Sequence, residues 1–175
     1  YEADNKEIHS SDENDKIIYN VVTLAKNNDI KKIILDDLVD GIASDLKKRI
    51  HIRSVKDLLI YSYRVAGTVG LMMAKILNVT KKNSLKSAID LGIAMQLTNI
   101  SRDVLEDSKN NRFYIEENFE NISSTVNLAN RYYQDSFYAI KSIPISFRFS
   151  ILVARRVYRK IGYKILKKKT WRTTK

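Results

Sequence analysis

Apolar residues recur every three or four positions along most of the chain, which is the spacing of helices that bury one face. In the first such stretch, DKIIYNVVTLAKNN, the pattern stops at a pair of asparagines before it begins again. Ser54 is placed to cap a long helix, and Pro144 is placed to start the last one. The pattern therefore predicts helices over six segments: 15–28, 30–48, 55–77, 84–108, about 124–141, and from Pro144 into the C-terminal tail.

The chain has few residues that break helices, with one proline and five glycines among its 175 residues. Hydrophobic residues make up 44%, which is enough for a buried core, and the length suits one domain. No linker or internal repeat divides the pattern. We therefore predict a single all-α domain over residues 1–175.

Oxygen-bearing side chains follow one another in the second half of the segment 84–108. Asn99, Asp103 and Asp107 are spaced four residues apart, so they share one helix face over roughly 12 Å. Gln96 lies one turn earlier on the same face. A polar stripe of this kind is common on exposed helices, and that interpretation stays open on spacing alone.

The residues just before the stripe favour a buried position. The stretch AIDLGIAMQLTNI is apolar or small nearly all round apart from Asp90, as in a helix covered on most sides. Gln96 and Asn99 would then lie inside, where polar groups without partners are costly. A polar cavity would supply those partners. Amide and carboxylate oxygens suit Mg²⁺, and Arg102 beside them suggests a substrate that carries a diphosphate.

Two glycines interrupt a helical pattern in the segment 61–73, YSYRVAGTVGLMM. Each of Gly67 and Gly70 costs a helix up to about 1 kcal/mol relative to alanine. Spacing alone favours a close contact between two helices as the reason. The functional alternative is that the small residues leave room for an elongated ligand.

Two stretches carry a specific resemblance. YSYRVAGTVGLMMAKIL, followed by AIDLGIAMQLTNISRDVLEDSKNNRFYI, resembles the squalene/phytoene synthase family, and within it the phytoene synthases. DGIASDL at 40–46 and ARRVYRKIGYKI at 154–165 are similar to two further helices of the family. The likeness extends from about Ile33 to Ile165. It implies an isoprenoid synthase fold, in which helices surround a central cavity with two acidic motifs across its mouth.

The resemblance also assigns roles to individual residues. Asn99, Asp103 and Asp107 match the second acidic motif, which holds Mg²⁺, with Mn²⁺ as an alternative ion. The two aspartates are therefore catalytic candidates. Tyr61, a third catalytic candidate, matches a tyrosine close to the reacting carbons. The candidates for substrate contact are Gln96, Arg102, Tyr158 and Arg64.

The family joins two prenyl diphosphates head to head through a cyclopropyl diphosphate and loses diphosphate at each step. The resemblance thus implies a phytoene synthase of carotenoid biosynthesis that acts on geranylgeranyl diphosphate. A squalene or dehydrosqualene synthase acting on farnesyl diphosphate is the nearest alternative, because the sequence does not show how deep the cavity is. A non-catalytic relative that acts in assembly or binding is an alternative of another class, and the intact second motif counts against it.

The chain departs from the family pattern at several positions. The family has Gly-Arg-x-Tyr-x-Pro after the second motif, whereas Asn111 and Glu116 stand at the Gly and Pro positions here. The stretch DDLVD at 36–40 is similar to an acidic motif, but it lies in the segment that matches a later helix. We expect its aspartates to form a solvated helix face, whereas Asp45 matches the family. The first acidic motif is then missing, so the 175 residues read as a fragment and are expected to be inactive alone.

The net charge is +11, and part of the excess lies in the C-terminal stretch YRKIGYKILKKKTWRTTK. A nucleic-acid binder is disfavoured, because basic and aromatic residues do not alternate on one clear face. The absence of cysteine and the acidic, polar opening of the chain favour the cytoplasm. The basic C-terminal residues suggest peripheral contact with the inner face of the membrane. Candidates for contact with anionic lipid are Lys164, Lys167, Lys168, Lys169 and Arg172, with Trp171 as either an interfacial anchor or an ordinary surface residue.

Overall fold

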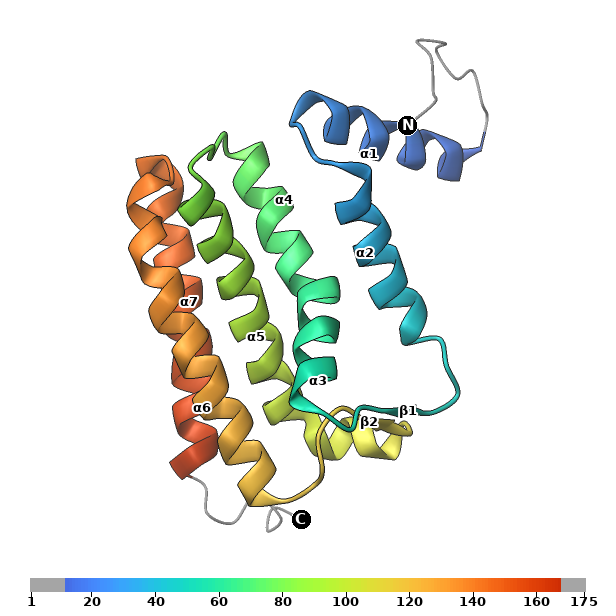
Figure 1. The fold of residues 1–175 in the computed structure, drawn as a ribbon, viewed down its shortest axis with the longest axis vertical. Helices are drawn as coiled ribbons and strands as arrows, with labels where there is room; N and C mark the ends of the chain where they lie inside the picture. The colour runs from blue at the N-terminus through green and yellow to red at the C-terminus, as the bar shows by residue number, and fades with distance from the viewer. Residues whose placement is uncertain (1–11, 168–175) are drawn as a thin grey trace.

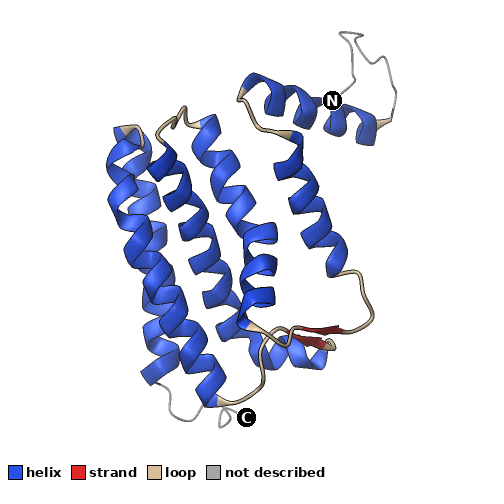
Figure 2. Ribbon diagram, viewed as in Figure 1, coloured by secondary structure: helices blue, strands red, loops and turns tan. Residues whose placement is uncertain are grey.

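The computed structural model describes residues 12–167, and within that range it is almost entirely helical (Figures 1 and 2). The all-α prediction is confirmed. No helix in this range is both long enough and apolar enough to cross a membrane. The helices are α1 (Glu13–Asn27), α2 (Lys32–Ser44), α3 (Val55–Ser62), α4 (Thr68–Ile76), α5 (Lys82–Lys109), α6 (Phe119–Asp135) and α7 (Ile145–Lys167), with a π-helical turn η1 (Tyr63–Gly67) and a 3₁₀ segment η2 (Ser136–Ser142).

Helix ends follow the local chemistry of the sequence. The Ser54 hydroxyl accepts a hydrogen bond from the backbone N–H of Asp57 at 3.0 Å and starts α3, as predicted. Just beyond α1 and α4, Asp29 and Asn78 adopt positive φ angles of 51° and 58°. Asp and Asn tolerate this left-handed conformation better than most residues, so the predicted ends of these two helices are confirmed.

Two of the predicted helices differ from the structure. The segment 55–77 is helical throughout, but the π-helical turn η1 interrupts it. In η1 the backbone hydrogen bonds join residues five apart, whereas in an α-helix they join residues four apart. The segment predicted from about 124 begins instead at Phe119, because the Asn118 side chain accepts a hydrogen bond from the N–H of Asn121 at 2.8 Å. Its last part, η2, winds as a 3₁₀ helix.

Two short strands, β1 (Ile50–His51) and β2 (Arg112–Phe113), pair in parallel and were not predicted. The Ile50 N–H donates to the carbonyl of Asn111 at 3.0 Å. Asn111 has a φ of 59°, which explains how asparagine can stand where the family pattern has glycine. The pairing brings the segment after α5 beside the segment before α3, and it therefore helps to assemble the site described below.

The long helix α5 forms the centre of the bundle (Figure 1). It packs against α4, α6 and α7, and its residues Ala94 and Leu97 have no exposed surface. Leu97 shares the main core with Leu58 of α3 and with Tyr133 of α6. Figure 1 shows α1 and α2 on one side of the bundle and α6 and α7 on the other. A polar face on α5 is therefore carried by the central, closely packed helix of the bundle.

Glycines allow α5 to approach the η1–α4 segment very closely. A Cβ atom on Gly92 would lie 2.8 Å from the carbonyl carbon of Ala66 and nearer still to its oxygen. The reverse contact is also close: a Cβ on Gly70 of α4 would lie 3.0 Å from the carbonyl carbon of Ala88 of α5, and nearer still to its oxygen. Each helix thus presents a glycine to the backbone of the other. The close-contact interpretation of Gly70 is confirmed.

Candidate functional site

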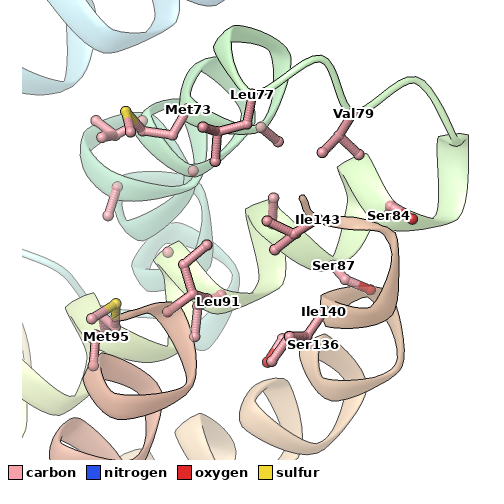
Figure 3. Close-up of a pocket in the computed structure, with 18 of the residues that line it drawn as sticks. Met73, Leu77, Val79, Ser84, Ser87, Leu91, Met95, Ser136, Ile140 and Ile143 are labelled. Atoms are coloured by element: carbon pink, nitrogen blue, oxygen red, sulfur yellow. The ribbon is translucent and has the colours of Figure 1, made fainter. Parts of the chain in front are cut away.

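An apolar cavity of about 390 Å³ lies beside α5, between α4, η2 and α7 (Figure 3). Gly70 lines this cavity as well, but the position that its Cβ would take is filled by the backbone of Ala88. Close packing therefore accounts for this glycine, and the ligand interpretation stays a prediction. Figure 3 shows the labelled side chains arranged around an open centre. Large apolar residues of the wall include Met73, Leu77, Leu91, Met95, Ile140 and Ile143.

The predicted polar face of α5 meets this cavity at one end. Gln96 and Asn99 line the cavity, whereas Asp103 and Asp107 continue the same face beyond it, one and two turns further along the helix. Both aspartates are partly exposed. The structure therefore confirms that this helix is largely buried, and it places its carboxylates at the polar end of an apolar chamber.

The side-chain oxygen of Asn99 is buried, and within residues 12–167 no hydrogen-bond partner reaches it. A buried polar atom without a partner carries a desolvation cost of about 1–3 kcal/mol. Such an atom at a cavity wall, one turn from Asp103, is explained if a ligand or ion supplies the missing partner. This observation supports the assignment of Asn99 as a ligand-binding residue.

Arg102 and Asp103 form a two-pronged ion pair at the end of the cavity. The Arg102 Nε and Nη2 atoms each donate to one carboxylate oxygen of Asp103, both at 2.7 Å. The guanidinium is 43% exposed and the carboxylate 33%, so the pair stays within reach of solvent and of a ligand. Arg102 can therefore turn its five donors to a phosphate when the aspartate engages a cation.

Asp107 differs electrostatically from Asp103. Burial and the neighbouring carboxylate of Asp103 raise the pKa of Asp107, with smaller contributions from Glu106 and Asp45, while Arg112 acts in the opposite direction. The site thus holds negative charge that the protein only partly neutralises. A divalent cation would relieve that repulsion.

The donor set on α5 is compatible with Mg²⁺ held jointly with a substrate. Within residues 12–167, no three His, Cys, Asp or Glu side chains gather to form a metal site by themselves. Asp103, Asp107 and Asn99 offer two carboxylates and one amide on one face. Mg²⁺ commonly takes one or two carboxylates and completes its shell with water and phosphate oxygens. These residues, with the unpartnered Asn99 oxygen, fit such an ion.

Tyr61 belongs to a hydrogen-bonded trio that sequence reasoning did not assemble. The hydroxyl groups of Tyr61 and Tyr114 each donate to one oxygen of the Asp45 carboxylate, both at 2.9 Å. The two rings stack with centroids 4.8 Å apart. Burial raises the pKa of Tyr61, and it raises the pKa of Tyr114 to about 12, so both phenols stay protonated at neutral pH.

Tyr114 is therefore a candidate site residue that the predictions missed. The signal was present, because Tyr114 is the tyrosine of the Gly-Arg-x-Tyr-x-Pro pattern, but nothing in the sequence tied it to Tyr61. The β1–β2 pairing supplies that link. Asp45 connects the trio to the acidic face of α5, since its charge contributes to the raised pKa of Asp107.

The two remaining predicted substrate contacts lie in different surroundings. Tyr158, on the inner side of α7, packs against the main core, and it lies near enough to Arg102 to contribute, after Asp103, to the raised pKa of that guanidinium. Arg64 points instead toward α2, where its guanidinium lies 3.7 Å from Asp37 and 3.4 Å from Asp40. The structure thus brings Tyr158 to the Arg102 side of the site, whereas Arg64 lines a polar cleft of about 720 Å³ that Tyr61 also lines.

The aspartates of the DDLVD stretch lie on α2 and do not face the α5 carboxylates. Asp36 pairs with Lys32 at 2.7 Å, and its side chain is 46% exposed. Asp40 is exposed, as expected for a solvated face. Asp37 is more covered than expected, at 23%, because Arg64 and Tyr63 lie against it. These contacts agree with the prediction that this stretch is not the family's first acidic motif.

Asp107→Asn is expected to stabilise the metal-free chain at pH 7. The pKa of Asp107 is higher in the folded chain, so the folded chain binds a proton at this carboxyl more tightly than the unfolded chain does. The charged form therefore destabilises the fold above the raised pKa, and the penalty vanishes as the pH falls toward the usual value of 3.8. Thermal melts in EDTA should show a higher Tm for the variant at pH 7 and equal values near the acid end.

Asp36→Asn is the matched control for this prediction, because Asp36 lies on a different helix, α2, and pairs with Lys32. It should not raise the Tm at pH 7. A destabilised Asp107→Asn chain at pH 7 would show that its carboxylate is compensated in the folded state and would contradict the prediction.

The squalene/phytoene synthase family model matches residues 2–119, which is more than half of the chain. The chain belongs to the squalene/phytoene synthase family. The match includes α5, with all three residues of the acidic motif, and extends through β2 to Tyr114. The resemblance found in the sequence is thereby confirmed.

Individual relatives agree with this membership of the squalene/phytoene synthase family. The chain is 35% identical over 162 residues to a 15-cis-phytoene synthase of Paracoccus sp. (strain N81106 / MBIC 01143), covering 82% of this chain and 53% of that protein. It is 34% identical to the 15-cis-phytoene synthase of Pantoea ananas, at 81% and 52% coverage. The chain thus spans about half the length of the curated relatives it matches.

A solved structure confirms the fold expected for a squalene/phytoene synthase. The squalene synthase HpnC from Alicyclobacillus acidocaldarius superposes with a TM-score of 0.69 at 14% identity, covering 82% of this chain and 62% of that one. The helices described here therefore have the arrangement of an isoprenoid synthase.

Proposed function

We propose that the protein carrying this chain is a Mg²⁺-dependent prenyltransferase that joins two prenyl diphosphates head to head, as a phytoene synthase. The product forms through a cyclopropyl diphosphate intermediate with loss of diphosphate at each step. One observation carries the proposal: a single buried helix, α5, forms both the wall of an apolar cavity and a row of metal-compatible oxygens at its end. An elongated hydrocarbon with a charged head group fits that combination.

The cavity residues would bind and shield the hydrocarbon chain. Their apolar side chains exclude water, which would otherwise capture a carbocation formed when the diphosphate leaves. Gln96 and Asn99 mark the change from the apolar to the polar part of the site. The prenyl chain would lie along α5 with its diphosphate beside Asp103, so that the bond to be broken lies at this boundary.

The polar end would hold and neutralise the diphosphate. Asn99, Asp103 and Asp107 would hold Mg²⁺, which when bound supplies charge neutralisation for the leaving group. Arg102 would donate its guanidinium N–H groups to phosphate oxygens. Tyr158, which lies near Arg102, would contact the same group.

The aromatic faces of Tyr61 and Tyr114 would stabilise the positive charge that develops on the substrate as the diphosphate leaves. Aromatic faces attract cations by about 0.5–2 kcal/mol, more when water is excluded. Asp45 fixes both phenols through its two oxygens, so the rings are held in place before the substrate arrives. Their raised pKa values keep the phenols neutral, and neither ring would act as a base near pH 7.

The length of the cavity favours a C20 substrate over a C15 one. Cavity-lining residues on α5 run from Ser84 to Asn99, about 22 Å along the helix axis. An extended carbon chain advances roughly 1.25 Å per C–C bond, so a geranylgeranyl chain spans about 19 Å and a farnesyl chain about 14 Å. A cavity lined over this length would accommodate the longer chain, which supports the proposal of a C20 substrate.

A squalene or dehydrosqualene synthase is the second candidate within this class, and a structural likeness favours it. A dehydrosqualene synthase solved in complex with a ligand superposes with a TM-score of 0.64 at 26% identity, covering 78% of this chain. A non-catalytic role is disfavoured, because the residues of the second acidic motif are all present. The inactivity expected of residues 1–175 alone stays a prediction.

Geranylgeranyl diphosphate and Mg²⁺ are expected to give phytoene with the protein that carries this chain, and EDTA should abolish the product. Ala88 lines the cavity about 16 Å from Asn99, beyond a farnesyl chain but within a geranylgeranyl chain. Ala88→Leu should therefore lower kcat/KM for the C20 substrate at least tenfold relative to the C15 substrate. Product extraction and chromatography measure both.

Ala43→Leu is the control for this substitution, because Ala43 is exposed on α2. It should leave the ratio of the two substrates unchanged. Formation of squalene or dehydrosqualene in preference to phytoene by the unaltered protein would favour the second candidate. A protein that binds neither prenyl diphosphate in the presence of Mg²⁺ would contradict the proposed function altogether.

A further inference from the structure

The outer face of α7 begins with an exposed apolar patch. Ile145 is 80% exposed and Phe149 75%, and Leu152 and Val153 on the next turn are 37% and 44% exposed. Residues spaced at three and four positions share one side of a helix, so the four side chains form a continuous strip. Water-exposed phenylalanine and isoleucine at this level mark a surface that contacts something apolar.

The same face becomes basic in the second half of the helix. Arg156, Lys160, Lys164 and Lys167 are all exposed and continue the strip toward the C-terminal end of α7. None of them takes part in an ion pair among the residues that the structure describes. The sequence of α7 has seven arginines and lysines and no aspartate or glutamate.

The inner face of α7 is already occupied by the protein. The Arg155 Nε donates to the carbonyl of Tyr133 at 3.0 Å, and the Arg159 Nε donates to the Asn130 side chain at 3.2 Å. Gly162 is buried against α6. The helix is thus fixed in rotation with its apolar and basic strip exposed to solvent. Figure 1 shows α7 beside α6 at the edge of the bundle.

The apolar part of the strip adjoins the far end of the cavity. Ile143 and Ile140 line the cavity, and Ile145 is exposed two residues later. The apolar start of the strip is therefore close along the chain to the wall of the cavity at the end opposite Asn99.

We propose that this face, defined by Ile145, Phe149, Leu152 and Val153 with Arg156, Lys160, Lys164 and Lys167, docks on an anionic lipid bilayer. The apolar half inserts among the acyl chains and the basic half binds the head groups, as in helices that lie in a membrane interface. The proposal rests on the proposed function for its purpose, since a C40 hydrocarbon cannot leave into water. Docking places the apolar end of the cavity at the bilayer.

Charge and shape together select a bilayer as the partner. A nucleic acid would use the cations but leave the phenylalanine and isoleucine in water. A second copy of the chain would bury the four exposed cations of this face, and α7 has no aspartate or glutamate to pair with them. Of the residues predicted to contact lipid, Lys164 and Lys167 belong to the docking face, whereas Lys168, Lys169, Trp171 and Arg172 lie outside the described residues.

The chain contains no cysteine, so single cysteines can report the depth of insertion directly. Ile145→Cys and Leu46→Cys replace side chains that are 80% and 83% exposed on opposite sides of the molecule. Each is labelled with an environment-sensitive fluorophore and mixed with vesicles of 70% phosphatidylcholine and 30% phosphatidylglycerol. The label at 145 should shift to the blue and resist aqueous quenchers, while the label at 46 should not change.

Charge variants test the basic half. The triple variant Arg156→Gln, Lys160→Gln, Lys164→Gln should weaken partitioning into these vesicles tenfold or more at 50 mM salt. The matched variant Lys16→Gln, Lys31→Gln, Lys56→Gln loses the same charge from exposed positions elsewhere and should partition like the unaltered chain. Circular dichroism confirms that both remain helical.

Four outcomes would overturn the proposal. Two concern the variants: an equal loss of vesicle partitioning in both triple variants, or equal blue shifts of the labels at positions 145 and 46. The other two are binding to neutral vesicles as strong as to anionic ones, and loss of vesicle binding when a protein of the relatives' full length is used. Concentration-dependent dimerisation that Phe149→Ser abolishes, without vesicle binding, would instead assign the face to a second copy. Binding is measured without substrate, so its failure alongside retained prenyl diphosphate binding would leave the proposed function standing.

Discussion

Asp103→Ala is expected to lower the turnover of prenyl diphosphate by at least about a hundredfold while leaving the helical signal unchanged. The lost carboxylate acts on the charge of the leaving diphosphate, where one electrostatic group commonly contributes a factor of 10²–10³. Asp107→Ala should have an effect of the same order. Asn99→Ala should cost less, because it removes a neutral ligand. Diphosphate release measures turnover in the protein that carries this chain.

Asp36→Ala removes the same charge from an exposed site on α2 and should leave turnover unchanged. A second readout does not depend on catalysis. Binding of Mn²⁺ in the presence of inorganic diphosphate, followed by electron paramagnetic resonance, should weaken in Asp103→Ala and not in Asp36→Ala. Unaltered turnover of both the Asp103 and the Asp107 variants at limiting Mg²⁺ would refute the assignment of this metal-binding face.

Gly92→Ala is expected to destabilise the fold by about 3 kcal/mol or more. Its new Cβ would meet the backbone carbonyl of Ala66, which cannot move aside as a side chain can. α5 and η1 would have to separate, and both carry residues of the cavity wall. A loss of this size is a large part of the stability of a small domain. Urea unfolding followed by circular dichroism measures it.

Gly162→Ala provides the comparison within the same chain. A Cβ there would lie 3.1 Å from a terminal methyl carbon of Val126, which can shift by a few tenths of an ångström. Alanine is also favoured over glycine inside a helix by up to about 1 kcal/mol. The substitution should therefore be close to neutral. Similar midpoints for the two variants would show that the backbone contact of Gly92 is not a packing constraint.

Much of the fold and part of the site followed from the sequence, because they depend on local pattern. Helical periodicity and the shortage of proline predicted the all-α fold, and Ser54 and the asparagines predicted helix ends. The regular spacing of Asn99 and Asp103 predicted their common face without reference to any other helix. Such features are encoded within a few neighbouring residues.

Features that depend on contacts between distant segments could not be read in this way. Asp45 and Tyr114 meet across 69 residues, through a two-residue strand pair that is too short to leave a sequence signal. The assignment of Arg64 to the substrate, which the resemblance implies, stays a prediction. A periodic pattern does not reveal that Arg64 of η1 lies against Asp37 and Asp40. The single extra residue of a π-helical turn changes which direction each following side chain faces.

The same helix, α5, lines the cavity and carries Asn99, Asp103 and Asp107, and this has a consequence for how substrate length can change in evolution. Under the proposed function, each isoprene unit adds four bonds, or about 5 Å, and one turn of α5 advances about 5.4 Å. Cavity-lining residues Met95, Leu91 and Ser87 therefore stand roughly one isoprene apart, counted from Asn99. A larger side chain at one of these positions would shorten the accepted chain by whole isoprene units, so specificity would shift in steps of five carbons.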